Sequence, residues 1–256
     1  MNITKFKKGT PITMVTCYDY TFAKALNKTE LDCVLVGDSV AMVVYGEDST
    51  THANPKMIER HVKAVKKGFQ GFIIADLPFM SLQKSKTDLL KDVKKLINAG
   101  ASAIKVEGVT GNEKAIKKII SAGVPVVGHI GLTPQFIHSF GGFKVQGRND
   151  SQKNFIKSEA LKFQELGVFM MVIECVPNDL CKEIVGLLDI PTVGIGAGSE
   201  TDGQVLVLHD LLGLTEKKFK FVKHYGKFFD ESVSAIKNFK SEVSEKTFPT
   251  EEHTFL

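Results

Sequence analysis

The sequence of 256 residues lacks the features that mark several large classes of protein. It contains no run of about 18 consecutive apolar residues, so no membrane-spanning helix is expected. Its first ten residues are polar, carry three lysines and are not followed by the apolar segment of a signal peptide. The net charge is only +4 and the basic residues are scattered, so no nucleic-acid-binding surface is expected. These absences predict a cytoplasmic protein with neither a membrane nor a nucleic-acid partner.

Cysteine is also scarce, since the chain has only four, at Cys17, Cys33, Cys175 and Cys181. They form no CxxC pair, and no Cys/His spacing typical of a zinc site is present. Cys17 and Cys33 lie in apolar runs, where cysteine behaves as a small buried hydrophobic residue. We therefore expect four free thiols.

The sequence does contain a regular alternation of apolar runs with amphipathic segments. The runs are short and rich in β-branched residues, as in strands buried on both faces of a parallel sheet. The amphipathic segments repeat apolar residues three and four positions apart, as helices do, and we expect glycine to cap them in the left-handed conformation. The expected strands are 11–17, 33–37, 72–76, 103–107, 124–129, 168–174, 191–195 and 205–209. One helix is expected to stop at Gly68, and the expected left-handed caps are Gly100, Gly123 and Gly167, which end later helices.

Eight strands alternating with helices favour an α/β protein with a (β/α)8 barrel of the TIM type, and the length suits one such domain. We expect helices to be capped by Asn54, with Pro55 at the first helical position, and by Asn178. A charged amphipathic helix is expected over about 230–246. Because no linker is evident, residues 1–256 are expected to form a single catalytic barrel domain with a C-terminal helical tail.

Four of the expected strands finish on an acidic residue. Asp38 follows the run 33–37, and Asp76, Glu107 and Glu174 close three later strands. Because the carboxyl ends of parallel barrel strands lie on one face, we expect these acids to converge. Asp38 and Asp76 have no obvious basic partner, and a hard divalent cation such as Mg²⁺ would relieve their repulsion. Each of these two aspartates, taken alone, is more often a turn or helix-cap residue.

Two further residues at strand ends carry chemical information. Lys105 and Glu107 are two positions apart, so both side chains point to the same side of their strand. Lys105 could therefore hold an acidic substrate or pair with Glu107 in an internal salt bridge, and the spacing favours neither. Glu174 ends an otherwise apolar run and is the candidate general base. The alternative for Glu174, a helix cap, is weakened because Asn178 already has that role.

A connection of about twenty residues after His129 is long for a compact domain. It includes Gly141–Arg148 and leaves the carboxyl end of a strand, where it could form a lid over the acids or an oligomer contact. His129 and His209 are each expected to end a strand, as substrate contacts or as hydrogen-bonded structural residues. The run Gly194–Gly198 is not a nucleotide-binding loop, because Ser199 replaces the last glycine of that fingerprint.

Nine motifs follow one another along the chain in a fixed order. They are Thr16–Tyr20, Val36–Ser39, Asp48–Thr50, Ala75–Phe79, Lys105–Gly108, Gly128–Gln135, Gly141–Arg148, Glu174–Pro177, and Gly194–Gly198 with Asp202–Gln204. Together they resemble the 3-methyl-2-oxobutanoate hydroxymethyltransferase (ketopantoate hydroxymethyltransferase) family. The resemblance extends from about Lys5 to His253.

This resemblance implies an enzyme that transfers a hydroxymethyl group from 5,10-methylenetetrahydrofolate to 3-methyl-2-oxobutanoate. The products would be 2-dehydropantoate (ketopantoate) and tetrahydrofolate, in the pathway to pantothenate and coenzyme A. The family pattern implies a Mg²⁺-stabilised enolate, and the partners would be a small 2-oxo acid and a folate. It also implies a (β/α)8 barrel that assembles as a homodecamer.

The resemblance assigns roles to six residues. By the family pattern Asp38 and Asp76 bind the metal and contact the substrate, and Glu107 coordinates the metal or lies in its outer sphere. Ser39 and Lys105 would contact the keto acid, and Glu174 would accept the proton.

Two other functions remain open at this point. One is a different Mg²⁺-dependent enolate enzyme of similar architecture, such as a carbon–carbon lyase acting on a 2-oxo acid. The other is an inactive barrel that serves in binding or assembly, which the presence of all four acids and Lys105 disfavours.

Overall fold

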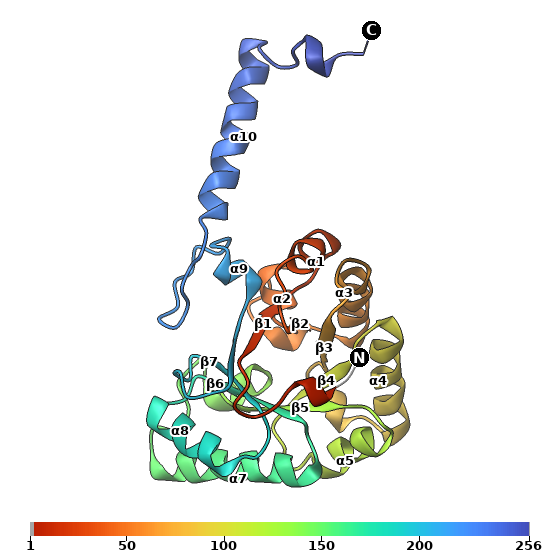
Figure 1. Ribbon diagram of the computed structural model, residues 1–256, viewed down its shortest axis with the longest axis vertical. Coiled ribbons are helices and arrows are strands. Elements are labelled where there is room, and N and C mark those ends of the chain that lie inside the picture. The colour runs from red at the N-terminus through yellow and green to blue at the C-terminus, as the bar shows by residue number, and fades with distance from the viewer. Residues whose placement is uncertain (1–2, 256) are drawn as a thin grey trace. The chain divides into compact units, whose positions relative to one another are not determined.

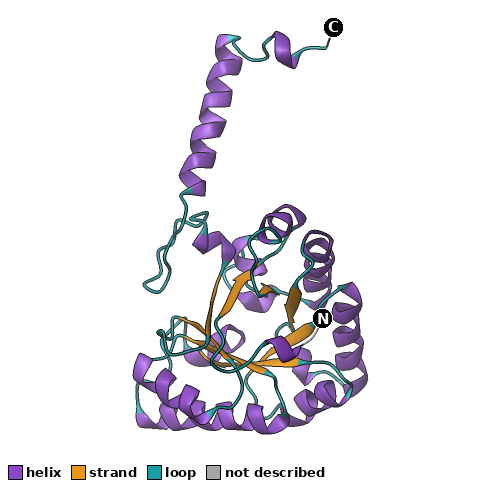
Figure 2. Ribbon diagram, viewed as in Figure 1, coloured by secondary structure: helices purple, strands orange, loops and turns teal. Residues whose placement is uncertain are grey.

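A computed structural model describes residues 3–255 and shows a closed barrel of eight parallel strands (Figures 1 and 2). Each strand pairs with the next along the chain, and the last pairs with the first. The strands are β1 Ile12–Thr16, β2 Cys33–Val36, β3 Phe72–Asp76, β4 Ala103–Glu107, β5 Val126–Gly131, β6 Met170–Glu174, β7 Thr192–Ile195 and β8 Gly203–Leu206. The predicted (β/α)8 fold class is therefore confirmed.

Helices connect the strands and surround the barrel (Figure 1). The α-helices of this part are α1 Tyr20–Leu26, α2 Val40–Val43, α3 Pro55–Gly68, α4 Lys86–Ala99, α5 Glu113–Ser121, α6 Ile137–Phe140, α7 Asp150–Leu166 and α8 Asn178–Leu187. Single 3₁₀ turns add η1 Ile3–Lys5, η2 Thr50–His52, η3 Ser81–Gln83 and η4 Pro134–Phe136.

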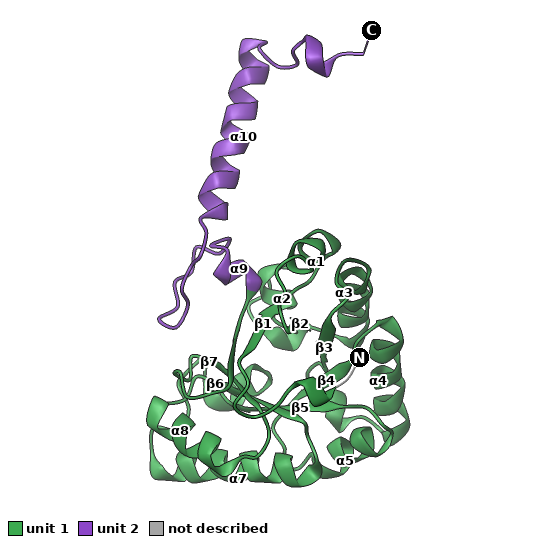
Figure 3. Cartoon of the chain, in the orientation of Figure 1, with its two compact units in different colours: residues 1–207 green, residues 208–256 purple. Residues whose placement is uncertain are grey.

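The chain divides into two compact units, residues 1–207 and 208–256 (Figure 3). The first unit holds the barrel, and the second holds α9 Leu208–Leu211, α10 Phe228–Glu245 and η5 Glu251–His253. Helix α10 corresponds to the amphipathic helix expected over 230–246. Across the described residues we find no helix whose length and apolar content would suit it to cross a membrane.

The barrel interior changes from apolar to charged along the strands. Alternate residues of each strand point inward, and the interior core consists of Phe6, Ile12, Met14, Cys33, Leu35, Phe72, Ile74, Ala103, Val127, Met170, Val172, Val193 and Val205. At the amino-terminal end the ring of Phe6 lies 5.0 Å from that of Phe72 and 6.1 Å from that of Phe169. These three rings form a floor beneath the inward residues. Toward the carboxyl ends, the same inward rows continue as Asp76, Lys105, Glu107, His129 and Glu174.

Six of the eight expected strands differ from the structure in at least one boundary, and two of these differences, in β5 and β8, affect predicted strand ends at His129 and His209. Strand β5 begins two residues later than expected and continues past His129 to Gly131, where it pairs with Glu174. Strand β8 begins earlier, at Gly203, because its register is set by pairing with Ile12 of β1. His209 therefore does not end a strand but lies in α9.

The helix caps were predicted with mixed success. Asn54 caps α3 as expected, since its Oδ1 accepts bonds of 3.1 Å from the backbone of Lys56 and Met57. Asn178 is not a cap, because Pro177 has that position and Asn178 is the first residue of α8. The Asn178 side chain instead packs against Gly198, where any Cβ atom would collide with it.

The glycines that end helices also divide into two kinds. Gly100 and Gly167 adopt the predicted left-handed cap, and Gly123 has a positive φ one residue beyond the cap of α5. Helix α3 ends at Gly68, as predicted. A Cβ atom there would lie 2.7 Å from the carbonyl oxygen of Tyr20, so this glycine permits α1 and α3 to approach closely.

All four cysteines are free and buried, as expected. Burial raises the pKa of the Cys17 and Cys33 thiols to about 12. They are therefore protonated and inert at neutral pH.

The floor of the barrel yields a stability prediction. Substituting Phe6→Ala removes a buried ring from between Phe72 and Phe169, so the free energy of unfolding is expected to fall by about 3 kcal/mol. Urea denaturation measures the change. Phe155→Ala, on the exposed face of α7, is the matched control and should cost less than about 0.5 kcal/mol. Equal losses in the two variants would contradict the assignment of Phe6 to the core.

Candidate active site

Strand register brings together the acids predicted at the strand ends. Asp76 of β3 pairs with Lys105 of β4, and Glu107 of β4 pairs with His129 of β5. Strand β6 adds Glu174, opposite Gly131 of β5. Because these residues lie on inward rows at the carboxyl ends of neighbouring strands, the predicted convergence is present.

Five ionisable side chains, which we call the charged network, form a continuous chain of contacts. Lys105 Nζ lies 3.0 Å from Asp76 Oδ1 and 3.3 Å from Glu107 Oε1. His129 continues the chain, with Nδ1 at 3.0 Å from Glu107 Oε1 and Nε2 at 3.2 Å from Glu174 Oε2. The side chain of Glu174 is 17% exposed, whereas the other four are at most 5% exposed. Glu174 is therefore the member of the network that is most open to a ligand.

The position of one proton on His129 determines how the network is bonded. Its Nδ1 atom lies 3.0 Å from Glu107 Oε1 and 3.1 Å from Lys105 Nζ. A protonated Nδ1 donates to the carboxylate, whereas a bare Nδ1 accepts from the ammonium group, so one tautomer cannot form both bonds. Burial and the charge of Lys105 are outweighed by Glu107 and Glu174, which raise the pKa of His129 to about 9. The protonated ring therefore places one N–H beside Glu107 and the other beside Glu174. The alternation of β5, which places His129 two residues after inward-facing Val127, is the sequence signal that could have identified it.

The buried charges shift one another's pKa values. Burial, together with the charges of Asp76 and Glu107, raises the pKa of Asp38 well above its usual value. Burial also raises the pKa of Asp76, although the charge of Lys105 opposes this. For Glu107, burial is outweighed by the charges of Lys105 and His129, which lower its pKa to about 2. For Lys105, burial is outweighed by the nearby acids, which raise its pKa above the ordinary value, so it stays cationic.

These contacts show one member of an open alternative and correct one premise. The internal salt bridge between Lys105 and Glu107 is present. The premise that Asp76 lacks a basic partner was wrong, because the inward row of β4 places Lys105 beside it.

Asp38 and Ser39 lie in the loop after β2, beside the charged network. The backbone nitrogen of Asp38 donates to Asp76 Oδ2 over 2.9 Å, which brings the two aspartates together. The Ser39 hydroxyl lies 2.7 Å from the Tyr18 hydroxyl, and burial raises the pKa of Tyr18. Tyr18 follows β1 by two residues and lies in the Thr16–Tyr20 motif, but it was not predicted as a site residue.

Gln135 is a second residue that sequence reasoning missed. It belongs to η4, in the long connection after β5, which contains η4 and α6 instead of being structureless. Its side-chain Nε2 donates to Asp38 Oδ2 over 2.8 Å, and its backbone nitrogen donates to Glu107 Oε2 over 2.9 Å. The Gly141–Arg148 segment lies farther along this connection, and its Gln146 nitrogen donates to the carbonyl of Cys175.

The donor set at this end of the barrel suits a hard cation. Four carboxylates face one lysine and one histidine, so a net negative charge remains when the acids are ionised. Within residues 3–255, no three acidic, histidine or cysteine side chains form a ready-made metal cage. Mg²⁺ is commonly held by one or two carboxylates, with water or substrate oxygens completing its coordination. Asp38 and Asp76, joined through the Asp38 backbone, fit that pattern.

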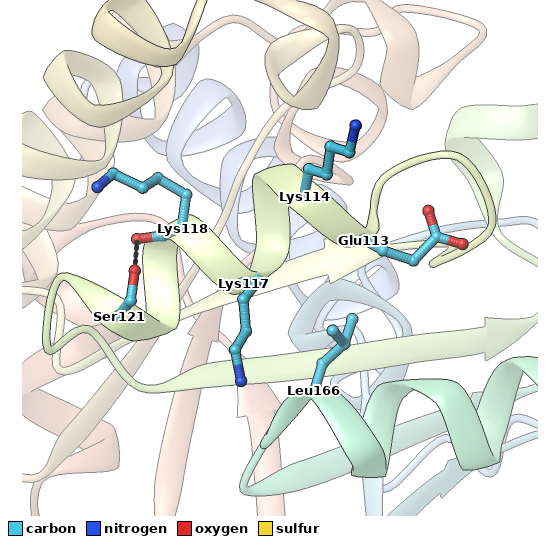
Figure 4. A pocket seen from close by; sticks show the side chains of 6 residues that line it. All are labelled: Glu113, Lys114, Lys117, Lys118, Ser121 and Leu166. Carbon is cyan, nitrogen blue, oxygen red and sulfur yellow. Dashed lines mark hydrogen bonds between the residues drawn. The ribbon is translucent and has the colours of Figure 1, made fainter.

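A surface hollow of about 450 Å³ lies elsewhere, along α5 and the end of α7 (Figure 4). It is lined by Glu113, Lys114, Lys117, Lys118, Ser121 and Leu166. The lysine side chains in Figure 4 extend in different directions and do not converge on a common point. The ionisable side chains of this hollow therefore do not form a connected set like the charged network.

Comparison with known proteins gives a consistent result. The sequence profile described as ketopantoate hydroxymethyltransferase matches residues 1–251. The chain is 49% identical over 256 residues to 3-methyl-2-oxobutanoate hydroxymethyltransferase of Francisella tularensis subsp. tularensis (strain FSC 198), covering 98% of this chain and 96% of that protein. It is 47% identical to the protein of that name from Legionella pneumophila (strain Paris), covering 95% and 94% of the two chains.

Solved structures show the same fold at much lower sequence identity. Phosphonopyruvate hydrolase, crystallised with oxalate and Mg²⁺, has a TM-score of 0.62 at 12% identity, covering 96% of this chain and 89% of that one. The triclinic crystal form of 2,3-dimethylmalate lyase, a member of the PEP mutase/isocitrate lyase superfamily, has a TM-score of 0.60 at 12% identity, with 96% and 88% coverage. These similarities concern the fold alone.

The central position of Lys105 yields a prediction about stability. Lys105→Met leaves Asp76 and Glu107 buried without their cation, so the free energy of unfolding is expected to fall by about 3 kcal/mol. Chemical denaturation at neutral pH measures it. Lys91→Met serves as control, because Lys91 pairs with Asp88 on the surface and should contribute less than about 0.5 kcal/mol. If the Lys105 variant were as stable as the control, the network would not depend on this cation.

Proposed function

The chain belongs to the ketopantoate hydroxymethyltransferase family, and we propose that it transfers a hydroxymethyl group from 5,10-methylenetetrahydrofolate to 3-methyl-2-oxobutanoate. The products would be 2-dehydropantoate and tetrahydrofolate, in pantothenate biosynthesis. The observation that carries this proposal is the match of the family over residues 1–251, together with the charged network at the carboxyl ends of β3 to β6. As a hydroxymethyltransferase, the enzyme must activate C3 of the keto acid as a nucleophile.

Glu174 is the residue that we assign to proton removal. Its partial exposure would allow it to reach the C3 proton of a bound keto acid, and its Oε2 atom lies 3.2 Å from His129 Nε2. Proton transfer to the Glu174 carboxylate leaves the electron pair on the substrate as an enolate. Water adds to the folate methylene carbon as both of its bonds to folate nitrogens break, which releases tetrahydrofolate and a one-carbon aldehyde. The nucleophilic C3 then bonds to the aldehyde carbon, and the resulting alkoxide takes up the proton held by Glu174.

Asp38 and Asp76 are the residues that would hold Mg²⁺. Bound there, Mg²⁺ would supply positive charge against the negative charge that develops on the substrate oxygen. Glu107 would coordinate Mg²⁺ or lie in its outer sphere, and both of its oxygens have protein partners, with Lys105 and His129 at Oε1 and the Gln135 nitrogen at Oε2.

Lys105 and Ser39 are assigned to the keto acid. A cationic Lys105 would attract the substrate carboxylate, and Ser39 would offer a hydroxyl group that Tyr18 holds in position. Asp38 and Asp76 would meet the same substrate through their cation. The family resemblance also supports a homodecamer in the cytoplasm. Size-exclusion chromatography with light scattering would test the assembly state.

The reaction is tested by an assay with 3-methyl-2-oxobutanoate, methylenetetrahydrofolate and Mg²⁺, in which each component is omitted in turn. We expect 2-dehydropantoate only when all three are present. Turnover that needs no folate would favour a carbon–carbon lyase. Exchange of the C3 proton with solvent deuterium would exclude an inactive barrel.

The base assignment predicts the behaviour of Glu174→Gln. This variant keeps the size of the side chain but cannot accept the proton, so C3 exchange is expected to fall roughly 10³-fold while Mg²⁺ and keto acid still bind. Proton NMR in deuterium oxide measures the exchange rate. Glu165→Gln, on the exposed part of α7, should exchange at the wild-type rate. Near-native exchange by the Glu174 variant would contradict its role.

The metal assignment predicts the behaviour of Asp38→Asn and Asp76→Asn. Each substitution removes one negative charge without changing the size of the side chain, so Mg²⁺ affinity is expected to fall at least tenfold. Isothermal titration calorimetry measures the affinity. Asp88→Asn on the exposed start of α4 is the control, and equal affinities in all three variants would remove Asp38 and Asp76 as ligands.

A further inference from the structure

We propose that Gln135 is a positioning residue that fixes the Asp38 carboxylate for metal and keto-acid binding. It also makes the connection after β5 an integral part of the site. This inference rests on the proposed function, since it takes Asp38 as a ligand of Mg²⁺. It assigns to Gln135 no contact with the reacting atoms.

Gln135 forms hydrogen bonds to residues at or just after the carboxyl ends of three different strands. Its Nε2 atom donates to Asp38 Oδ2, after β2, over 2.8 Å and to the carbonyl oxygen of Leu77, after β3, over 3.0 Å. Its backbone nitrogen donates to Glu107 Oε2, at the end of β4, over 2.9 Å. Gln135 itself follows β5, so one residue connects the ends of four neighbouring strands.

The chemistry of these contacts requires an amide side chain. The Leu77 carbonyl can only accept a hydrogen bond, and the same is true of an ionised Asp38 carboxylate. Both hydrogens of the Gln135 NH₂ group are therefore used. Glutamate has no donor for these acceptors, and asparagine is one methylene shorter. The Leu77 contact anchors the amide to a backbone that is itself fixed, because the Leu77 nitrogen donates to the Lys105 carbonyl over 2.9 Å.

Because the Gln135 amide is held in place, it also holds the Asp38 side chain in position. With Oδ2 bonded to Gln135 and its backbone nitrogen bonded to Asp76, Asp38 is held at both ends. The side chain of Gln135 is buried, so water does not readily replace it as a donor. Outer-shell hydrogen bonds of this kind orient metal ligands, and their loss typically lowers metal affinity 10- to 100-fold.

The test is a titration of the purified full-length protein with MgCl₂ alone, followed by calorimetry. Gln135→Met keeps the length of the side chain and the backbone bond to Glu107 but removes both side-chain donors. We expect its Kd for Mg²⁺ to rise at least tenfold. The KM for 3-methyl-2-oxobutanoate is expected to rise as well, whereas the KM for methylenetetrahydrofolate should stay within twofold of the wild-type value.

Gln146→Met is the matched control. Gln146 is a buried glutamine of the same connection, and its side chain donates only to the nearby Lys144 carbonyl among the bonds found in residues 3–255. It should lose a comparable hydrogen bond without altering Mg²⁺ affinity. Thermal unfolding in EDTA compares the stability of the two variants. If Gln135→Met does not fold, Gln135→Asn provides the same comparison, because its shorter amide cannot reach both acceptors.

The outcomes separate the inference from the proposed function. A wild-type protein that binds Mg²⁺, with an unchanged or tighter Kd in the Gln135 variant, would overturn the positioning role alone. A wild-type protein that does not bind Mg²⁺ would overturn the metal assignment and the inference with it. A weaker Kd in the Gln135 variant but not in the Gln146 variant would support the role. Equal weakening in both variants would show a general effect of the connection and overturn it.

Discussion

The charged end of the barrel depends on the ion pairs formed by the buried ammonium group of Lys105. It lies within 3.3 Å of carboxylate oxygens of both Asp76 and Glu107, and these side chains are buried. Buried carboxylates of like charge repel one another strongly where little water screens them. The cation on the inward row of β4 helps to lower the pKa of Glu107 and opposes the rise that burial causes in the pKa of Asp76. The proposed sites for Mg²⁺ and keto acid are built around this charge balance.

The fold could be predicted from the sequence because its signals are local. Strands such as Phe72–Asp76 and Ala103–Glu107 are continuous apolar runs, and their predicted bounds agree with the structure. The errors occur where contacts with a segment far away in the sequence determine the local structure. Strand β8 starts at Gly203 because β1 pairs with it there, and His129 does not end β5 because the strand continues to pair Gly131 with Glu174. Neither partner can be identified from the local sequence pattern.

The site could be predicted only in part, for the same reason. Asp76, Glu107 and Glu174 end apolar runs, so the parallel strands of a barrel were enough to bring them together. Gln135 lies 97 residues from Asp38, and its own neighbours give no sign of that partner. His129 could have been found by following the alternation of β5 from the apolar core into the charged layer. Contacts made by loops depend on the closed barrel, whereas contacts made by strands depend mainly on register.

The rings of Phe6, Phe72 and Phe169 contact one another and close the amino-terminal end of the barrel. Because apolar side chains fill the interior above this floor, the charged layer is approached from the carboxyl ends of the strands. Any ligand of the proposed site would therefore enter and leave by that same end.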